Sequence, residues 1–132
     1  MCAQAPEPGS PEDWLSHAVS DLDVSRTRPS PAVLFETLCF HAQQAAEKAI
    51  KAVLISRGIP FPRTHDLREL IGMLPADIEQ PSALSEAHVL TYYAVLTRYP
   101  GGVERLTPEQ HRSAVQCAEG VVRWAQSLTR RT

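Results

Sequence analysis

The stretch from Arg98 to Arg112 gathers arginines, a histidine and a Gly-bearing loop within fifteen residues. An arginine can stabilise negative charge on a phosphoryl group, and a histidine can act as a general acid or base near neutral pH. Arg98, Arg105 and His111 are therefore candidates for binding or cleaving a phosphate ester. In the structural alternative, Arg98 and Tyr99 close a loop against the preceding helix and Arg105 is simply exposed.

A second group of polar residues follows one flank of a long predicted helix: His41, Gln44, Lys48 and Lys51. Spacings of three and four residues bring side chains to a common side of a helix. His41, Lys48 and Lys51 could therefore bind the base and phosphate of a nucleotide. The alternative is the solvated side of an amphipathic helix, with Glu47 and Lys51 as a pair one turn apart.

A third group lies in the loop from Gly58 to Asp66, where Thr64, His65 and Asp66 precede a short predicted helix. The N-terminus of a helix favours an anion, which makes His65 a candidate nucleotide or RNA contact. In the structural alternative, Phe61 packs into the core, Asp66 caps the helix and His65 binds a backbone carbonyl.

Several common chemistries have no support in the sequence. The motifs GxxxxGK[ST], GxGxxG, HExxH and GxSxG are absent, and no convincing catalytic carboxylate pair occurs. Cys2, Cys39 and Cys117 are odd in number and form no CxxC pair, which argues against a disulfide scaffold and a zinc site. We expect no metal and no cofactor, with Cys39 and Cys117 as small core residues.

The apolar spacing predicts an all-α domain that positions these groups. Start and stop signals divide the chain into helices over about 11–27, 31–57, a short segment after Asp66, 83–98 and 108–128. The expected start signals are Ser10-Pro11, Ser30-Pro31, Asp66 with Glu69, Ser82 and Thr107-Pro108. Val19, Leu34 and Val95 are expected on apolar inner faces. We predict an up-and-down bundle of about five helices over residues 10–129, with loose tails at 1–9 and 130–132.

The overall balance of charge excludes a bulk polycation that holds nucleic acid by charge alone. Thirteen basic against fifteen acidic residues give a net charge of −2, although residues 98–132 carry a net +3. No apolar run approaches the ~20 residues that cross a bilayer, and no signal peptide is visible. We therefore expect a cytoplasmic protein without membrane contact.

The block from Cys39 to the turn Thr64-His65-Asp66-Leu67, together with Arg98-Tyr99-Pro100, resembles the HEPN domain family over roughly residues 11–128. The resemblance implies a bundle of about five helices and a homodimer packed through long helices. It also implies a partner: members often occur beside a minimal nucleotidyltransferase, and some such pairs behave as toxin and antitoxin. Many relatives are metal-independent ribonucleases with an Arg, four to six residues, and then a His.

Arg105 and His111, with five residues between them, fit that ribonuclease spacing. Two features differ from the nuclease members: Leu106 follows the arginine where a polar residue is usual, and Thr107-Pro108 starts a new helix between the pair. Three functions stay open. They are a nucleotide- or RNA-linked module that acts with a nucleotidyltransferase, an endoribonuclease built on Arg105 and His111, and a structural dimerisation bundle without a ligand.

Overall fold

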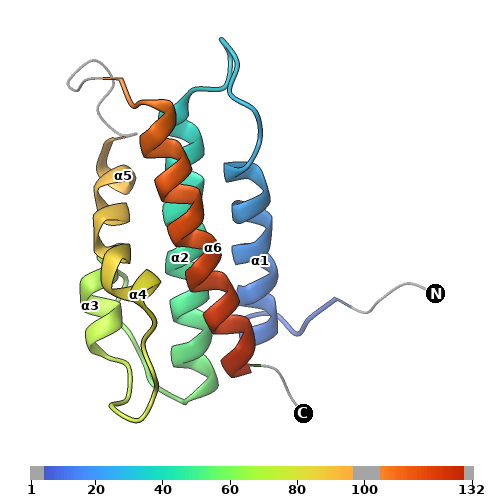
Figure 1. Cartoon of the computed structure of the whole chain (residues 1–132). Coiled ribbons are helices and arrows are strands. Elements are labelled where there is room, and N and C mark those ends of the chain that lie inside the picture. The colour runs from blue at the N-terminus through green and yellow to red at the C-terminus, as the bar shows by residue number, and fades with distance from the viewer. Residues whose placement is uncertain (1–4, 97–104, 130–132) are drawn as a thin grey trace.

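The computed structural model describes residues 5–96 and 105–129, and helices account for nearly all of its regular structure (Figure 1). The elements are α1 (Pro11–Ser25), α2 (Phe35–Ser56), α3 (Leu67–Gly72), α4 (Ser82–Glu86), the 3₁₀ helix η1 (Ala87–Leu90), α5 (Thr91–Leu96) and α6 (Pro108–Thr129). Over these residues the prediction of an all-α bundle is confirmed. Within the same ranges a single isolated bridge, Ser30 to Val33, is the one β-type pairing.

Helix α2 occupies the centre of the bundle (Figure 1). It packs against α1, against α6 and against the group of short helices from α3 to α5. Small and branched side chains along its apolar face are fully buried: Leu38, Cys39, Ala42, Ala45, Ala46, Ala49, Ile50, Val53 and Leu54. The alanines allow neighbouring helices to approach closely, as their spacing predicts. Val19 and Leu34 do not face inward as expected, because they are 36% and 37% exposed.

Several predicted helix ends are confirmed by their capping hydrogen bonds. Ser10 Oγ accepts from the Asp13 N–H at 3.1 Å, and Asp66 caps α3 by accepting from the Arg68 N–H at 3.0 Å. The Asp66 N–H donates to Thr64 Oγ1 at 3.1 Å rather than to Glu69, its expected partner. At the start of α6, Gln110 N–H donates to Thr107 Oγ1 and Thr107 N–H donates to Gln110 Oε1, at 3.1 and 2.8 Å. This reciprocal pair is a capping box, which fixes where α6 begins.

The end of α2 is closed by Gly58, whose φ is +70°. The Gly58 N–H donates to the Ile55 carbonyl at 3.0 Å, and the Ile59 N–H donates to the Leu54 carbonyl at 2.9 Å. These two bonds form a Schellman motif, which needs a left-handed residue that glycine adopts at low cost. The predicted stop at Gly58 is confirmed.

Two predicted helices differ from the structure. The second begins at Phe35 rather than residue 31, because Ser30 and Val33 bond to each other through both backbone groups, at 3.0 Å each. The fourth is interrupted by η1, and Ser82 is its first residue instead of its cap. Its buried residues Leu84, Ala87, Leu90 and Tyr93 recur every three positions, a repeat that suits a 3₁₀ helix. The same repeat turns Val95 outward, against our expectation.

Candidate functional site

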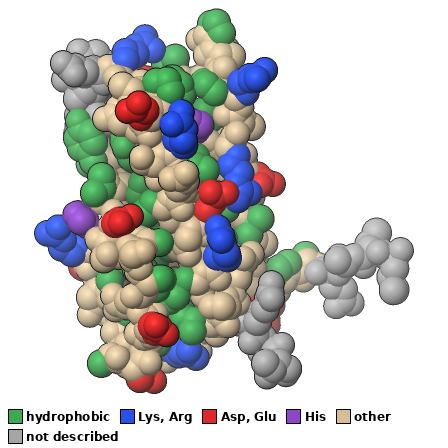
Figure 2. Space-filling view, viewed as in Figure 1, with side chains coloured by type: hydrophobic (Ala, Val, Ile, Leu, Met, Phe, Trp, Pro, Cys, Tyr) green, Lys and Arg blue, Asp and Glu red, His purple; other side chains and the backbone are tan. Residues whose placement is uncertain are grey.

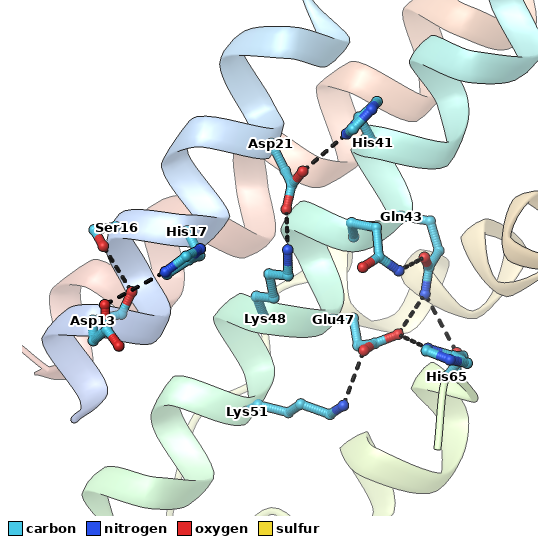
Figure 3. Close-up of polar contacts among 11 residues, drawn as sticks. Asp13, Ser16, His17, Asp21, His41, Gln43, Glu47, Lys48, Lys51 and His65 are labelled. Carbon is cyan, nitrogen blue, oxygen red and sulfur yellow. Dashed lines mark hydrogen bonds and ion pairs between the residues drawn. The ribbon is translucent and has the colours of Figure 1, made fainter. Parts of the chain in front are cut away.

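A largely buried polar cluster lies where α2 meets the loop before α3 (Figure 3). We call Gln43, Glu47, Lys51 and His65 the Glu47 cluster. Glu47 Oε2 accepts from Lys51 Nζ at 2.9 Å, while Glu47 Oε1 lies 2.8 Å from His65 Nδ1 and accepts from Gln43 Nε2 at 2.9 Å. Glu47 is 3% exposed and Lys51 7%. The buried charges of this cluster thus have their partners inside the protein.

Aromatic rings complete the surroundings of the Lys51 ammonium group. Nζ lies 5.6 Å from the centroid of Trp14 on α1 and 5.4 Å from that of Phe61, and the two rings meet edge to face. Cation–π attraction and the Glu47 carboxylate together satisfy the buried charge. Lys51 therefore links α1, α2 and the 59–66 loop, and its charge is already balanced.

A second polar cluster joins α1 to α2 around Asp21 (Figure 3). Asp21 Oδ2 accepts from Lys48 Nζ at 2.6 Å, and Asp21 Oδ1 lies 2.9 Å from His41 Nδ1. Asp21 is one acid among several on α1, and no sequence pattern singles it out. We call Asp21, His41 and Lys48 the Asp21 cluster.

These contacts change the interpretation of the α2 flank. The pairing of Glu47 with Lys51 is confirmed, but the prediction of a solvated helix side is wrong because both clusters lie between elements. His65 binds the Glu47 carboxylate and not a backbone carbonyl, while Phe61 does pack against the core. Four of the five predicted nucleotide or RNA contacts, His41, Lys48, Lys51 and His65, thus divide between two clusters. In each cluster one carboxylate pairs with a lysine and contacts a histidine.

The two catalytic candidates lie near the beginning of α6 and contact consecutive residues of α2. Arg105 Nη1 lies 3.8 Å from Glu36 Oε2, and the Arg105 side chain is 76% exposed. The His111 ring packs on Phe35, with centroids 5.4 Å apart, and its Nε2 donates to the carbonyl of buried Ser25 at 2.6 Å. The start of α2 therefore holds both Arg105 and His111. Arg98, the remaining candidate, lies outside the described residues.

A cavity of about 370 Å³ opens beside Arg105, between the α1–α2 connection, the start of α2 and residues 105–106. Glu36 and Arg105 are its charged lining residues, and the rest of the lining is mainly apolar. Sequence patterns do not point to Glu36, because the Leu106 backbone that it binds is 70 positions away and lies outside the helices. A larger cavity, about 560 Å³, lies between Glu79, Pro81 and the second half of α6.

The described cysteines are not arranged for chemistry. Burial, with the charge of Glu36, raises the pKa of Cys39 to about 12; burial, with Glu86, raises the pKa of Cys117 to about 11. Both thiols stay protonated at neutral pH, so the expected role as core residues fits them. Among residues 5–96 and 105–129, no group of three or more His, Cys, Asp or Glu could hold a metal ion.

An exposed apolar stripe runs along the outer face of η1 and α5. Val89, Tyr92 and Val95 are 55%, 53% and 51% exposed, and their three-residue spacing places them in one row. Hydrophobic surface follows this edge of the molecule in Figure 2. A cavity of about 200 Å³, lined in part by Val89, Tyr93 and Cys117, lies next to the row. We call Val89, Tyr92 and Val95 the α5 stripe.

In the part of the chain that the structure describes, no helix combines the length and apolarity that crossing a bilayer requires.

One family profile and two solved structures match the chain. The profile of the HEPN domain matches residues 11–128. TT1696 from Thermus thermophilus superposes with a TM-score of 0.77 at 27% identity, covering 89% of this chain and 97% of that one. ST0689, an archaeal HEPN homologue, gives a TM-score of 0.67 at 28% identity, with coverage of 89% and 96%. No functionally curated protein matches the chain.

Proposed function

The chain belongs to the HEPN domain family, and we propose that it is the binding partner of a minimal nucleotidyltransferase in the cytoplasm. The observation that carries this proposal is the α5 stripe, in which three large apolar side chains are each more than half exposed. Exposed apolar rows of this kind are typical of protein contacts. Aromatic residues such as Tyr92 are enriched at the centre of interfaces.

The lysines of α2 support the same proposal, because each already pairs with a carboxylate of this protein. Lys48 and Lys51 each form an ion pair within the protein, at 2.6 and 2.9 Å. Binding a nucleotide phosphate there would require breaking a pair that is at least partly desolvated, which is costly. Nucleotide chemistry therefore fits better in the partner protein than on the α2 flank of this one.

The identity of the partner comes from the family resemblance. Members often occur beside a minimal nucleotidyltransferase, and the two proteins would form a nucleotide- or RNA-linked pair of the toxin–antitoxin type. We also propose a homodimer, since family members usually pair through long helices. The α5 stripe is assigned to the nucleotidyltransferase, and the second copy of this chain uses another face.

Co-expression tests this assignment. The chain is produced with a nucleotidyltransferase from its own genome, and we expect the two to co-purify. Replacing Tyr92 with Glu should abolish co-purification, while Val24→Glu is the matched control, because Val24 is also exposed but lies on α1. Light scattering on the same variants assigns the occupant. If only Tyr92→Glu abolishes the homodimer, the α5 stripe binds the second copy of this chain and not the nucleotidyltransferase. If the chain forms no complex with any nucleotidyltransferase, the proposal is contradicted.

A second candidate function is a metal-independent endoribonuclease. It is favoured by the contacts of Arg105 and His111 with the adjacent residues Glu36 and Phe35. In such a reaction the RNA 2′-oxygen bonds to phosphorus, the bond to the 5′-oxygen breaks, and a 2′,3′-cyclic phosphate forms. Arg105 would hold the phosphate, and His111 would transfer a proton through Nδ1, because its Nε2 donates to Ser25.

Cleavage of labelled structured RNA in a metal chelator tests the second candidate. Arg105→Gln is the sharper variant, since the exposed Arg105 side chain contributes little to folding. His111→Ala is assayed beside it after circular dichroism has shown that it is folded. Cleavage by the wild type that both variants lose would support a ribonuclease. Cleavage retained in either variant would remove that residue from the reaction.

A further inference from the structure

Glu36 makes two contacts with the segment that precedes α6. Its Oε1 accepts a hydrogen bond from the Leu106 N–H at 3.0 Å, and its Oε2 lies 3.8 Å from Arg105 Nη1. Leu106 is buried and Glu36 is mostly covered, whereas Arg105 extends into solvent. The carboxylate thus fixes the backbone of this segment with one oxygen and faces the guanidinium group with the other.

The guanidinium group is therefore held beside the 370 Å³ cavity in a partly neutralised state. The apolar lining of this cavity, which includes Val33 and Leu34, offers a recess to the base that accompanies a phosphate. The two charged groups at this cavity have opposite effects on an anion. Arg105 attracts a phosphate, while Glu36 repels it and competes for the same guanidinium.

We infer that Glu36 is a positioning residue for Arg105 and that its charge lowers the affinity of this site for single-stranded RNA. The inference rests on the second candidate function in one respect, which is that Arg105 meets an RNA phosphate. An ion pair as long as 3.8 Å, with its arginine exposed, is weak, so a phosphate can displace Glu36 from Arg105. The hydrogen bond to Leu106 remains during that exchange and keeps Arg105 at the cavity.

Glu36→Gln separates the two roles of the side chain. The amide oxygen can still accept from the Leu106 N–H, but the negative charge is removed. We expect this variant to bind a short fluorescent single-stranded RNA about two- to fivefold more tightly than the wild type, in a chelator at low salt. Fluorescence anisotropy gives the dissociation constants.

Glu69→Gln is the matched control for net charge. Glu69 is exposed on α3, at the opposite end of the bundle from the start of α6 (Figure 1). The Glu69→Gln variant should bind RNA as the wild type does. Equal affinities of Glu36→Gln and Glu69→Gln would overturn the role of Glu36, because the gain would then be absent or due to net charge alone.

The Arg105→Gln variant distinguishes a failure of this inference from a failure of the ribonuclease proposal. It should weaken binding and reduce the slope of log K against log salt by roughly 0.7, the value of one phosphate contact on a single strand. Adding Glu36→Gln to Arg105→Gln should then give no gain, and a gain that persists would overturn the inference. RNA binding unchanged by Arg105→Gln, or undetectable in every variant, would remove the phosphate contact and with it both ideas.

Discussion

Glu47 and Lys51, one turn apart on α2, form an ion pair of 2.9 Å inside the protein. Glu47 also meets His65 and Gln43, so one carboxylate connects the central helix to the loop before α3. Buried pairs are rarely a large source of net stability, but they penalise any arrangement that leaves one charge alone. We interpret the Glu47 cluster as a device that fixes how this loop docks on α2.

Removing the carboxylate of Glu47 should destabilise the fold strongly. Glu47→Ala leaves Lys51 buried without its partner, and we expect a loss of about 3–5 kcal/mol in the free energy of unfolding. Urea denaturation measures it. The double variant Glu47→Leu, Lys51→Met removes both charges and should recover most of the lost stability. If it does not, the unpaired charge of Lys51 is not the cause of the loss in Glu47→Ala.

Sequence reasoning finds this pair but not its setting. The spacing of Glu47 and Lys51 predicts an i, i+4 contact. It says nothing of Trp14 and Phe61, which come from other elements and turn a flank expected to be solvated into an interface. Local rules describe one helix at a time, whereas the pairing of Lys48 with Asp21 and the aromatic contacts of Lys51 depend on packing between elements.

Gly120 marks a close approach between α6 and α4. A Cβ at this position would lie 2.6 Å from the Ala83 Cβ, too close for two carbon atoms. Gly120→Ala should therefore destabilise the protein by about 1–3 kcal/mol, despite the better helix propensity of alanine. Thermal unfolding checks this, and Ala83→Gly in the same chain should restore part of the stability. A more stable Gly120→Ala protein would show that the helices can separate freely.

His111 should contribute to stability whether or not it is catalytic. Its Nε2 satisfies the carbonyl of Ser25, a residue that is fully buried. His111→Ala should cost about 1–3 kcal/mol through the unpaired carbonyl. Arg105→Gln, by comparison, should change the free energy of unfolding by less than about 0.5 kcal/mol. If the two variants are equally stable in urea, the hydrogen bond to Ser25 carries little weight.

Raised pKa values of the thiols predict a loss of stability in alkali. Burial raises the pKa of Cys39 from 9.0 to about 12 in the folded protein, so the unfolded chain releases this proton first. The stabilising contribution is complete below pH 9 and declines as the pH rises toward 12. Cys39→Ala should flatten this decline in urea titrations from about pH 8 to about pH 11. If stability declines with pH in Cys39→Ala as it does in the wild type, other titrating groups cause the decline.

The helices themselves are predictable where a local signal decides them. Thr107 caps α6 as expected, and α2 ends before Gly58 as expected. The 3₁₀ segment at Ala87–Leu90 escapes prediction because a three-residue repeat of apolar side chains also fits a continuous α-helix. The candidate site divides in the same way. The pair Arg105 and His111 fits the ribonuclease spacing that the family resemblance implies, whereas Glu36 becomes visible only through its contacts in three dimensions.

The affinity for the nucleotidyltransferase tests the central proposal most directly. Isothermal titration calorimetry of the wild type, Tyr92→Glu and Val24→Glu against the purified partner compares the exposed row on α5 with an exposed site on α1. We predict binding by the wild type and Val24→Glu, and at least about tenfold weaker binding by Tyr92→Glu. Equal binding by all three proteins would contradict the α5 stripe as the docking surface, and no binding by the wild type would contradict the partnership itself.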